Sequence, residues 1–154
     1  MFAGGLEICY QLRSEPQKKI GGCWNRNCSK RIVLVIEDEA NIRNFASRVL
    51  ELEGYRVLQA ENGNECFRLM RESQVDLIVL DLKLPGVDGW VLLEKLKNDL
   101  ELSSVPVVVF TASAAASQRE KALRMGAVDY LVKPISTTRL KEAVTRALCL
   151  KRRR

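Results

Sequence analysis

The sequence predicts a doubly wound α/β fold, in which a five-stranded parallel sheet is covered by helices on both faces. Apolar runs of strand length alternate with segments of helical periodicity between residues 31 and 150. Several of these runs, such as IVLVI and VVVF, are apolar on both faces, which is typical of central parallel strands. The length of 154 residues is enough for one domain with its own hydrophobic core.

The predicted strands are short apolar runs, most of which end in polar residues. In chain order they are RIVLVIED (31–38), YRVLQA (55–60), VDLIVLDL (75–82), VPVVVFTAS (105–113) and DYLVKP (129–134). The second run is the most mixed in composition, which favours an edge position in the sheet.

The predicted helices follow the strands as amphipathic segments. The first is EANIRNFASRVLELEG, and its apolar residues with helical spacing are Ile42, Phe45, Ala46, Val49 and Leu50. Gly54 provides the stop signal of this helix. The next three are NECFRLMRE (64–72), GWVLLEKLK (89–97) and SQREKALRMGA (117–127). The last helix places Leu140, Ala143, Val144, Ala147 and Leu148 on one face.

Composition divides the chain into three parts: a basic N-terminal extension (1–30), a domain (31–150) and a basic tail (151–154). Glycine and proline punctuate the extension and no period is sustained there, so we expect it to be flexible. The net charge of +6 comes from the two ends, and the domain between them is mildly acidic. We expect these ends to be solvated and not to bind nucleic acid, since no aromatic residues accompany the C-terminal basic run.

The absence of histidine excludes Ser/His/Asp triads, Cys/His pairs and His-based metal sites. The five cysteines are irregularly spaced, and we interpret them as reduced, unpaired thiols: Cys9, Cys23, Cys28, Cys66 and Cys149. No apolar run approaches the roughly 20 residues of a membrane helix, and no basic signal-peptide region begins the chain. We therefore expect a cytoplasmic protein that does not bind membranes.

Polar residues follow four of the predicted strands, where ligands bind in open parallel sheets. They are Glu37 and Asp38 after the first strand, Asp81 after the third, Thr111 after the fourth and Lys133 after the fifth. Carboxylates about 5 Å apart repel each other by about 3 kcal/mol at an effective dielectric constant of 20, so this cluster needs a cation. Oxygen ligands favour Mg²⁺, and the carboxylate of Asp81 could act as a phosphoryl acceptor.

At these positions the chain resembles the receiver domain of bacterial two-component response regulators. The resemblance rests on VIEDE, on VDLIVLDLKLPGVDGW, on FTA around Thr111 and on DYLVKP, which occur in the family's order and spacing across residues 31–150. It implies a flavodoxin-like fold with strand order 2-1-3-4-5. It also implies signalling by a phosphoprotein that assists its own phosphorylation and dephosphorylation and is not otherwise an enzyme.

The resemblance implies a role for each matching residue. Asp81 would be the phosphoacceptor, and Asp38 would bind the metal directly. Glu37, where the family more often has Asp, would act through water. Lys83 would offer its backbone carbonyl to the metal, and its side chain and Ser113 would influence phosphoryl lifetime.

Further roles concern the switch and the surrounding loops. Thr111 would be the switch hydroxyl, beside the small Ala112. Tyr130 would be the aromatic switch residue, although without the family pattern it would be interpreted as a surface aromatic. Lys133 would pair with the phosphoryl group, aimed by a cis bond to Pro134. We expect Gly86 and Gly89 to adopt unusual dihedral angles in the loop after Asp81.

The expected partners are a sensor histidine kinase or a phosphotransfer protein, which would supply the missing histidine, and a downstream protein. The output face would be the fourth helix, fifth strand and fifth helix, which include Arg119, Lys121, Arg124, Tyr130, Arg139 and Arg146. Because no output domain fits after residue 150, we expect a stand-alone receiver or the receiver fragment of a longer DNA-binding regulator or hybrid kinase.

Three other functions fit the sequence less well. An aspartyl-phosphate phosphatase usually has a second Asp two residues after the first, where this chain has Lys83. A nucleotide or flavin binder needs a glycine-rich loop after the first strand, where this chain has Glu37, Asp38 and Glu39. A receiver-like scaffold that is not phosphorylated does not need the complete set of acidic, hydroxyl and lysine residues, and this chain has the complete set.

Overall fold

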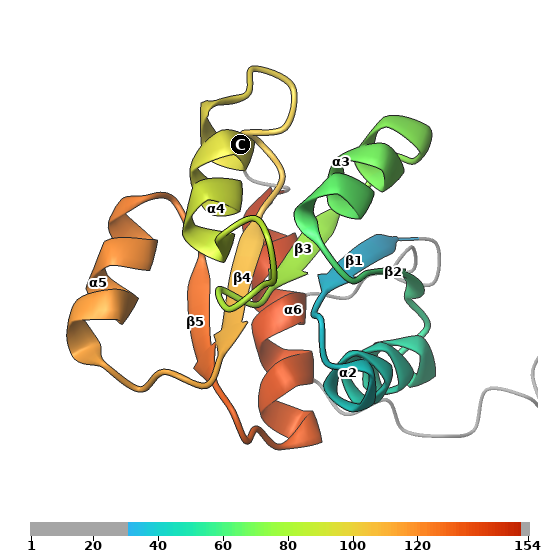
Figure 1. Cartoon of the computed structure of the whole chain (residues 1–154). Coiled ribbons are helices and arrows are strands. Elements are labelled where there is room, and N and C mark those ends of the chain that lie inside the picture. Colours follow the sequence, from blue (N-terminus) through green and yellow to red (C-terminus); the bar gives the residue numbers. More distant parts are fainter. Residues whose placement is uncertain (1–30, 152–154) are drawn as a thin grey trace, which may run out of the picture.

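The computed structural model describes residues 31–151. The expected N-terminal extension, with Cys9, Cys23 and Cys28, and residues 152–154 of the tail lie outside the described residues. In the described part, five strands alternate with five helices (Figure 1). The strands are β1 (Ile32–Ile36), β2 (Arg56–Ala60), β3 (Leu77–Leu80), β4 (Val107–Thr111) and β5 (Asp129–Val132). The helices are α2 (Ala40–Leu52), α3 (Gly63–Glu72), α4 (Gly89–Asn98), α5 (Ala116–Arg124) and α6 (Thr137–Lys151).

The sheet is parallel throughout and has the predicted strand order β2-β1-β3-β4-β5. β3 is the central strand and is buried at all four positions. β2 lies at one edge, as its mixed composition predicts. Since all five strands run in the same direction, their carboxyl ends meet along one edge of the sheet.

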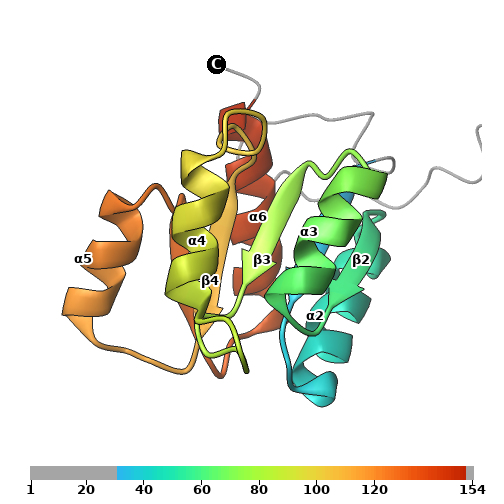
Figure 2. The ribbon, with the colours of Figure 1, turned by 45° about the horizontal axis from the view of Figure 1, so that its top comes forward.

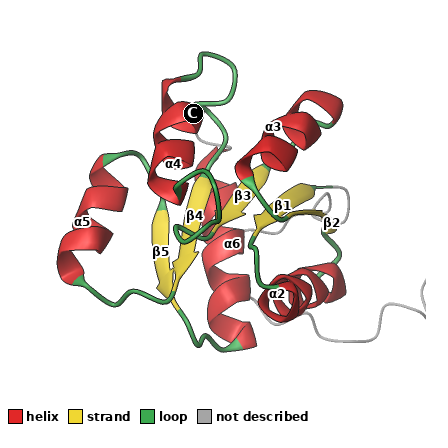
Figure 3. Cartoon of the chain, in the orientation of Figure 1, coloured by secondary structure: helices red, strands yellow, loops and turns green. Residues whose placement is uncertain are grey.

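The helices form a layer on each face of the sheet, and alternate residues of each strand contact the two layers. Figure 2 shows α3 and α4 in front of the sheet, α5 to their left and α6 behind the sheet. On one side, Leu34 and Ile36 of β1 join a core with residues of α3, α4 and α5. On the other side, Val33 and Val35 join a core with α2 and α6. The predicted doubly wound fold is confirmed, and its helices cover both faces (Figure 3).

The buried face of α2 differs from the predicted apolar stripe. Ala46, Val49 and Leu50 are buried as expected, but Phe45 is 41% exposed. The guanidinium-bearing Arg43 is buried in its place. Helical spacing alone does not reveal this exchange, because a buried arginine depends on polar partners that come from other parts of the chain.

Gly54 follows the last turn of α2 with φ of 90°, so the predicted stop is confirmed. Among residues 31–151, no helix is both long enough and apolar enough to cross a membrane.

Candidate functional site

The carboxyl ends of four strands bring the predicted site residues together. Glu37 and Asp38 directly follow β1, and Asp81 directly follows β3. Thr111 is the last residue of β4, and Lys133 comes immediately after β5. The parallel ladder fixes these positions, because neighbouring strands end at the same level in the sheet.

Three carboxylates form the centre of the site. Glu37, Asp38 and Asp81 can each place one oxygen within 4.8 Å of the others. Glu37 is 2% exposed and Asp81 is 4% exposed, whereas Asp38 is exposed. Such a cluster of hard oxygen ligands is suited to Mg²⁺, since the mutual repulsion of the carboxylates is relieved by a divalent cation.

Lys133 lies against two of these carboxylates. Its ammonium donates to Oε2 of Glu37 at 2.5 Å and to Oδ2 of Asp81 at 2.8 Å. It also lies 5.1 Å from the centre of the Phe110 ring in β4. Burial lowers the pKa of Lys133, but the hydrogen bonds to Asp81 and Glu37 outweigh burial and the pKa is raised. The bond between Lys133 and Pro134 is cis, as expected.

Glu37 is the most deeply buried of the three carboxylates. Burial raises its pKa to about 7, although the hydrogen bond from Lys133 acts in the opposite direction. Its second oxygen, Oε1, accepts the backbone N–H of Glu39 at 3.2 Å. Both oxygens of Glu37 are therefore engaged within the protein, which leaves Asp38 as the more accessible carboxylate of the pair.

Thr111 presents a hydroxyl whose hydrogen-bonding capacity is unused. It is 1% exposed, and its Oγ1 has no hydrogen-bond partner among the described residues. Leaving a buried hydroxyl unpaired costs about 1–3 kcal/mol, so such groups are rare in native proteins. The hydroxyl is thus available to a group that enters the site.

Tyr130 points into the protein and not into solvent. It is 2% exposed, and its hydroxyl donates to the backbone carbonyl of Ser113 at 2.9 Å. Interpretation as a surface aromatic, which the residue type alone favours, is therefore wrong. The bond connects β5 with the loop that follows Thr111.

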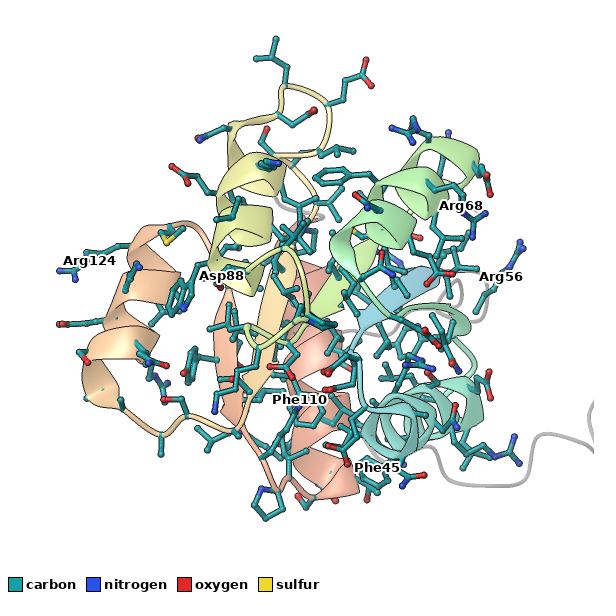
Figure 4. The ribbon with its side chains drawn as sticks, in the orientation of Figure 1. Phe45, Arg56, Arg68, Asp88, Phe110 and Arg124 are labelled. Atoms are coloured by element: carbon teal, nitrogen blue, oxygen red, sulfur yellow. The ribbon has the colours of Figure 1, made fainter. Side chains whose placement is uncertain are left out.

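The loop between β3 and α4 approaches the site closely. Oδ1 of Asp81 accepts the backbone N–H of Lys83 at 3.0 Å, and Asp88 caps the start of α4 by accepting from the N–H of Trp90. Figure 4 labels Asp88 at this position. A cavity of about 680 Å³, lined in part by Asp38, Lys83 and Trp90, opens beside the carboxylates.

Glycine is required at the two loop positions for different structural reasons. Gly86 has φ of 80°, so the expected unusual dihedral angle is confirmed. For Gly89 the expectation is wrong, because its φ is not in the left-handed region. A Cβ at Gly89 would instead lie 2.4 Å from Cα of Leu82 and 2.6 Å from the carbonyl oxygen of Asp81. Gly89 therefore permits the close approach of α4 to the backbone of Asp81.

Arg43 is a neighbour of the site that was not predicted from the sequence. Its guanidinium donates to the backbone carbonyls of Glu37 and Asp38. An arginine in the first turns of a helix is usually exposed, so the only available signal was its position on the otherwise apolar face of α2.

Comparison with known proteins identifies the family. The model of the response regulator receiver domain matches residues 33–145. The chain belongs to this family. The receiver domain of NtrX from Brucella abortus is 30% identical, with a TM-score of 0.71 over 75% of this chain and 97% of that one. A CheY-like receiver domain protein from Methanospirillum hungatei is 26% identical, with a TM-score of 0.73 over 80% of this chain and 97% of that one.

Curated relatives of this receiver domain are longer proteins. The transcriptional regulatory protein ResD of Bacillus subtilis is 38% identical over 79% of this chain and 48% of its own length. The phosphate regulon transcriptional regulatory protein PhoB of Escherichia coli is 38% identical over 80% of this chain and 52% of its own length. The chain therefore spans about half the length of the curated relatives that it matches.

Proposed function

We propose that Asp81 accepts a phosphoryl group from a phosphohistidine of a sensor kinase or a phosphotransfer protein. The unpartnered hydroxyl of Thr111 is the observation that carries this proposal. It is buried at the same edge of the sheet as a carboxylate, Asp81, and an ammonium, Lys133. A phosphoryl oxygen would supply the acceptor that this hydroxyl lacks, and Lys133 would pair with the new charge.

The transfer replaces one bond to phosphorus by another. A carboxylate oxygen of Asp81 attacks the phosphorus, the N–P bond of the phosphohistidine breaks, and the imidazole leaves with its electron pair. The product on this chain is an acyl phosphate at Asp81. Attack by water on phosphorus would later release inorganic phosphate and regenerate the carboxylate.

Mg²⁺ would be held by Asp38 and Asp81 and by the backbone carbonyl of Lys83, with Glu37 acting through water. When bound, the ion neutralises negative charge on the carboxylates and the phosphoryl oxygens. The engagement of both Glu37 oxygens by Lys133 and Glu39 supports an indirect role for Glu37. The exposure of Asp38 supports a direct one.

Thr111 and Tyr130 would transmit phosphorylation to the surface. Hydrogen bonding of Thr111 to the phosphoryl group would draw in the loop that begins at Ala112. Because the hydroxyl of Tyr130 is bonded to Ser113 of that loop, this movement would couple the conformations of Thr111 and Tyr130. The affected surface would be the face formed by α5, β5 and α6, which includes Arg119, Lys121, Arg124, Arg139 and Arg146.

The output depends on the protein as a whole. Since the matched segment covers only about half of relatives that are transcriptional regulatory proteins, we propose that this receiver controls a DNA-binding partner domain or acts on a separate protein. The face of α5, β5 and α6 would make that contact. This face already has internal ion pairs: Oδ2 of Asp129 in β5 lies 3.4 Å from Nη2 of Arg139 and 3.2 Å from Nη2 of Arg146.

The test is incubation with Mg²⁺ and acetyl phosphate, followed by measurement of the intact mass. We expect one added phosphoryl group, which is lost on treatment with hydroxylamine and absent from Asp81→Asn. Asp88→Asn is the matched control, because Asn keeps the cap of α4 while removing a neighbouring carboxylate. Absence of phosphorylation with both acetyl phosphate and a histidine kinase would refute the proposal, and fast multiple turnover of the donor would instead favour a phosphatase.

A further inference from the structure

We infer that Arg43 is a positioning residue for the acidic pair, and that it sets the affinity of the site for a divalent cation. The inference rests on the proposed function, since it concerns the same metal site. Among the described residues, Arg43 makes no hydrogen bond or ion pair with the carboxylates of Glu37, Asp38 or Asp81. It acts on the backbone that carries Glu37 and Asp38.

The guanidinium of Arg43 spans two segments of the chain. Nη1 donates to the carbonyl oxygen of Glu37 at 2.8 Å and to that of Asp38 at 3.3 Å. On its other side, Nη2 donates to Glu61 at 2.9 Å and Nε to Gln59 at 3.3 Å. Four acceptors therefore surround one planar group, which is 8% exposed as a residue.

The acceptors on the far side give the guanidinium a fixed base. Gln59 lies in β2, and Glu61 directly follows that strand. β2 pairs with β1 along its full length, with Ile36 opposite Ala60. Arg43 thus connects the loop after β1 to the neighbouring strand β2. The position of that loop therefore does not depend on α2 alone.

The loop itself has few other restraints. Glu39, the residue that precedes α2, makes no side-chain capping bond. The backbone N–H of Glu37 donates to the carbonyl of Ala60 at 3.0 Å, which holds the start of the loop. Beyond this point, the carbonyls of Glu37 and Asp38 are held by Arg43, so the direction of the Asp38 side chain follows from this contact.

Two opposite effects of Arg43 on cation affinity can be distinguished. A positive charge near the site repels a metal ion, so its removal would tighten binding if electrostatics dominated. The ion pair with Glu61 offsets this charge, however, and the hydrogen bonds to two carbonyls are direct. Partners that orient metal ligands typically change metal affinity by about 10–100-fold. We therefore expect positioning to dominate.

The test measures binding of Mn²⁺ to the full chain, with the free ion followed by electron paramagnetic resonance. Arg43→Met should raise the dissociation constant about 10-fold, and Arg43→Lys should also weaken binding, since one ammonium cannot reproduce the four contacts of the guanidinium. Unchanged or tighter binding by Arg43→Met would overturn the inference.

Two control variants on α2 separate positioning from a general loss of stability. Val49→Ala removes two buried methyl groups remote from the loop, and Arg48→Met removes an exposed guanidinium whose ion pair within residues 31–151 is with Glu51 at 3.8 Å. Both should leave the dissociation constant within about twofold of the wild type, because neither touches the Glu37 or Asp38 carbonyls. If Val49→Ala weakens Mn²⁺ binding as much as Arg43→Met, Arg43 has only a structural role and the inference fails.

Failure of the proposed metal site has a separate signature. In that case the wild type would either not bind Mn²⁺ or bind it no more tightly than Asp38→Asn does. The positioning role of Arg43 would then be refuted together with the metal site. If the wild type binds Mn²⁺ through Asp38 but Arg43→Met binds equally well, the site stands and only the role of Arg43 is refuted.

Discussion

At the scale of single residues, the hydroxyl of Thr111 is the feature that best distinguishes a site that binds a phosphoryl group from a scaffold that binds none. It is buried at the end of β4, and no described residue forms a hydrogen bond with it. The protein therefore carries the desolvation cost of this group in the unphosphorylated state. A scaffold with no incoming ligand would gain by having an apolar residue at this position.

Replacing Thr111 by Val should test this interpretation, since the two side chains have the same shape. We expect the free energy of unfolding to rise by about 1 kcal/mol, because an unpaired hydroxyl is removed from the interior. Denaturant unfolding of the unphosphorylated protein measures the change. We also expect Thr111→Val to accept a phosphoryl group but to lose the accompanying change in fluorescence or amide chemical shifts.

Thr145 provides the matched control for this substitution. Its hydroxyl lies 3.4 Å from that of Tyr55, so Thr145→Val removes a partnered group and should not stabilise the protein. A loss of more than about 1 kcal/mol in Thr111→Val would show that the Thr111 hydroxyl is already satisfied.

At the scale of the elements, the approach of α4 to β3 determines the geometry around Asp81. Gly89 begins α4, and its N–H donates to the carbonyl of Leu82 at 3.1 Å. A methyl group at this position would overlap the backbone of both Leu82 and Asp81. Backbone atoms cannot rotate away as a flexible side chain can, so the helix or the strand would have to move.

We predict that Gly89→Ala lowers the free energy of unfolding by about 2–3 kcal/mol and slows phosphorylation, because the acceptor backbone is displaced. Gly63→Ala is the control at the first residue of α3. Its nearest contact would be Cβ of Val87 at 3.5 Å, an ordinary distance. We expect the control to change stability by no more than about 0.5 kcal/mol, since helix propensity favours Ala. Equal effects of the two substitutions would contradict the close-approach explanation.

The helices also differ in how firmly they are held. α5 buries only Ala122 among its nine residues, and Ala115 at its start makes no side-chain capping bond. α6, in contrast, buries Leu140, Ala143 and Val144 in the core it shares with α2. α5 follows the loop of Thr111 and Ser113, so the least anchored helix is the one next to the proposed switch.

At the scale of the whole molecule, the acidic site and the fold are energetically linked. Three carboxylates that converge only in the folded state repel each other there, and a cation that binds them stabilises the folded state. We expect the midpoint of thermal unfolding to rise with Mg²⁺, corresponding to about 2.7 kcal/mol at a concentration 100 times the dissociation constant. Calorimetry with and without EDTA measures this shift.

Asp38→Asn should remove most of the stabilisation by Mg²⁺, because it removes the accessible carboxylate of the cluster. Asp88→Asn should keep it, since Asp88 lies outside the cluster. Equal stabilisation of both variants would show that the ion acts at another place or by a general salt effect.

Much of the fold could be predicted from sequence because parallel strands have a strong local signature. IVLVI and VVVF are apolar at every position, and the polar residue after each strand marks the edge where a site forms. Glu37, Asp81 and Lys133 were found in this way, and their distances confirm that they lie together. What the pattern could not predict depends on contacts between segments: the burial of Arg43, the inward position of Tyr130 and the close approach at Gly89.

The most direct test of the central claim is to locate the phosphoryl group chemically. The protein is treated with Mg²⁺ and acetyl phosphate, reduced with sodium borohydride to convert an acyl phosphate to the alcohol, and sequenced by tandem mass spectrometry. We predict homoserine at position 81 and unmodified aspartate at position 38. Reduction at Asp38, or no reduction at Asp81 in a protein that has gained a phosphoryl group, would contradict the assignment of Asp81 as the acceptor.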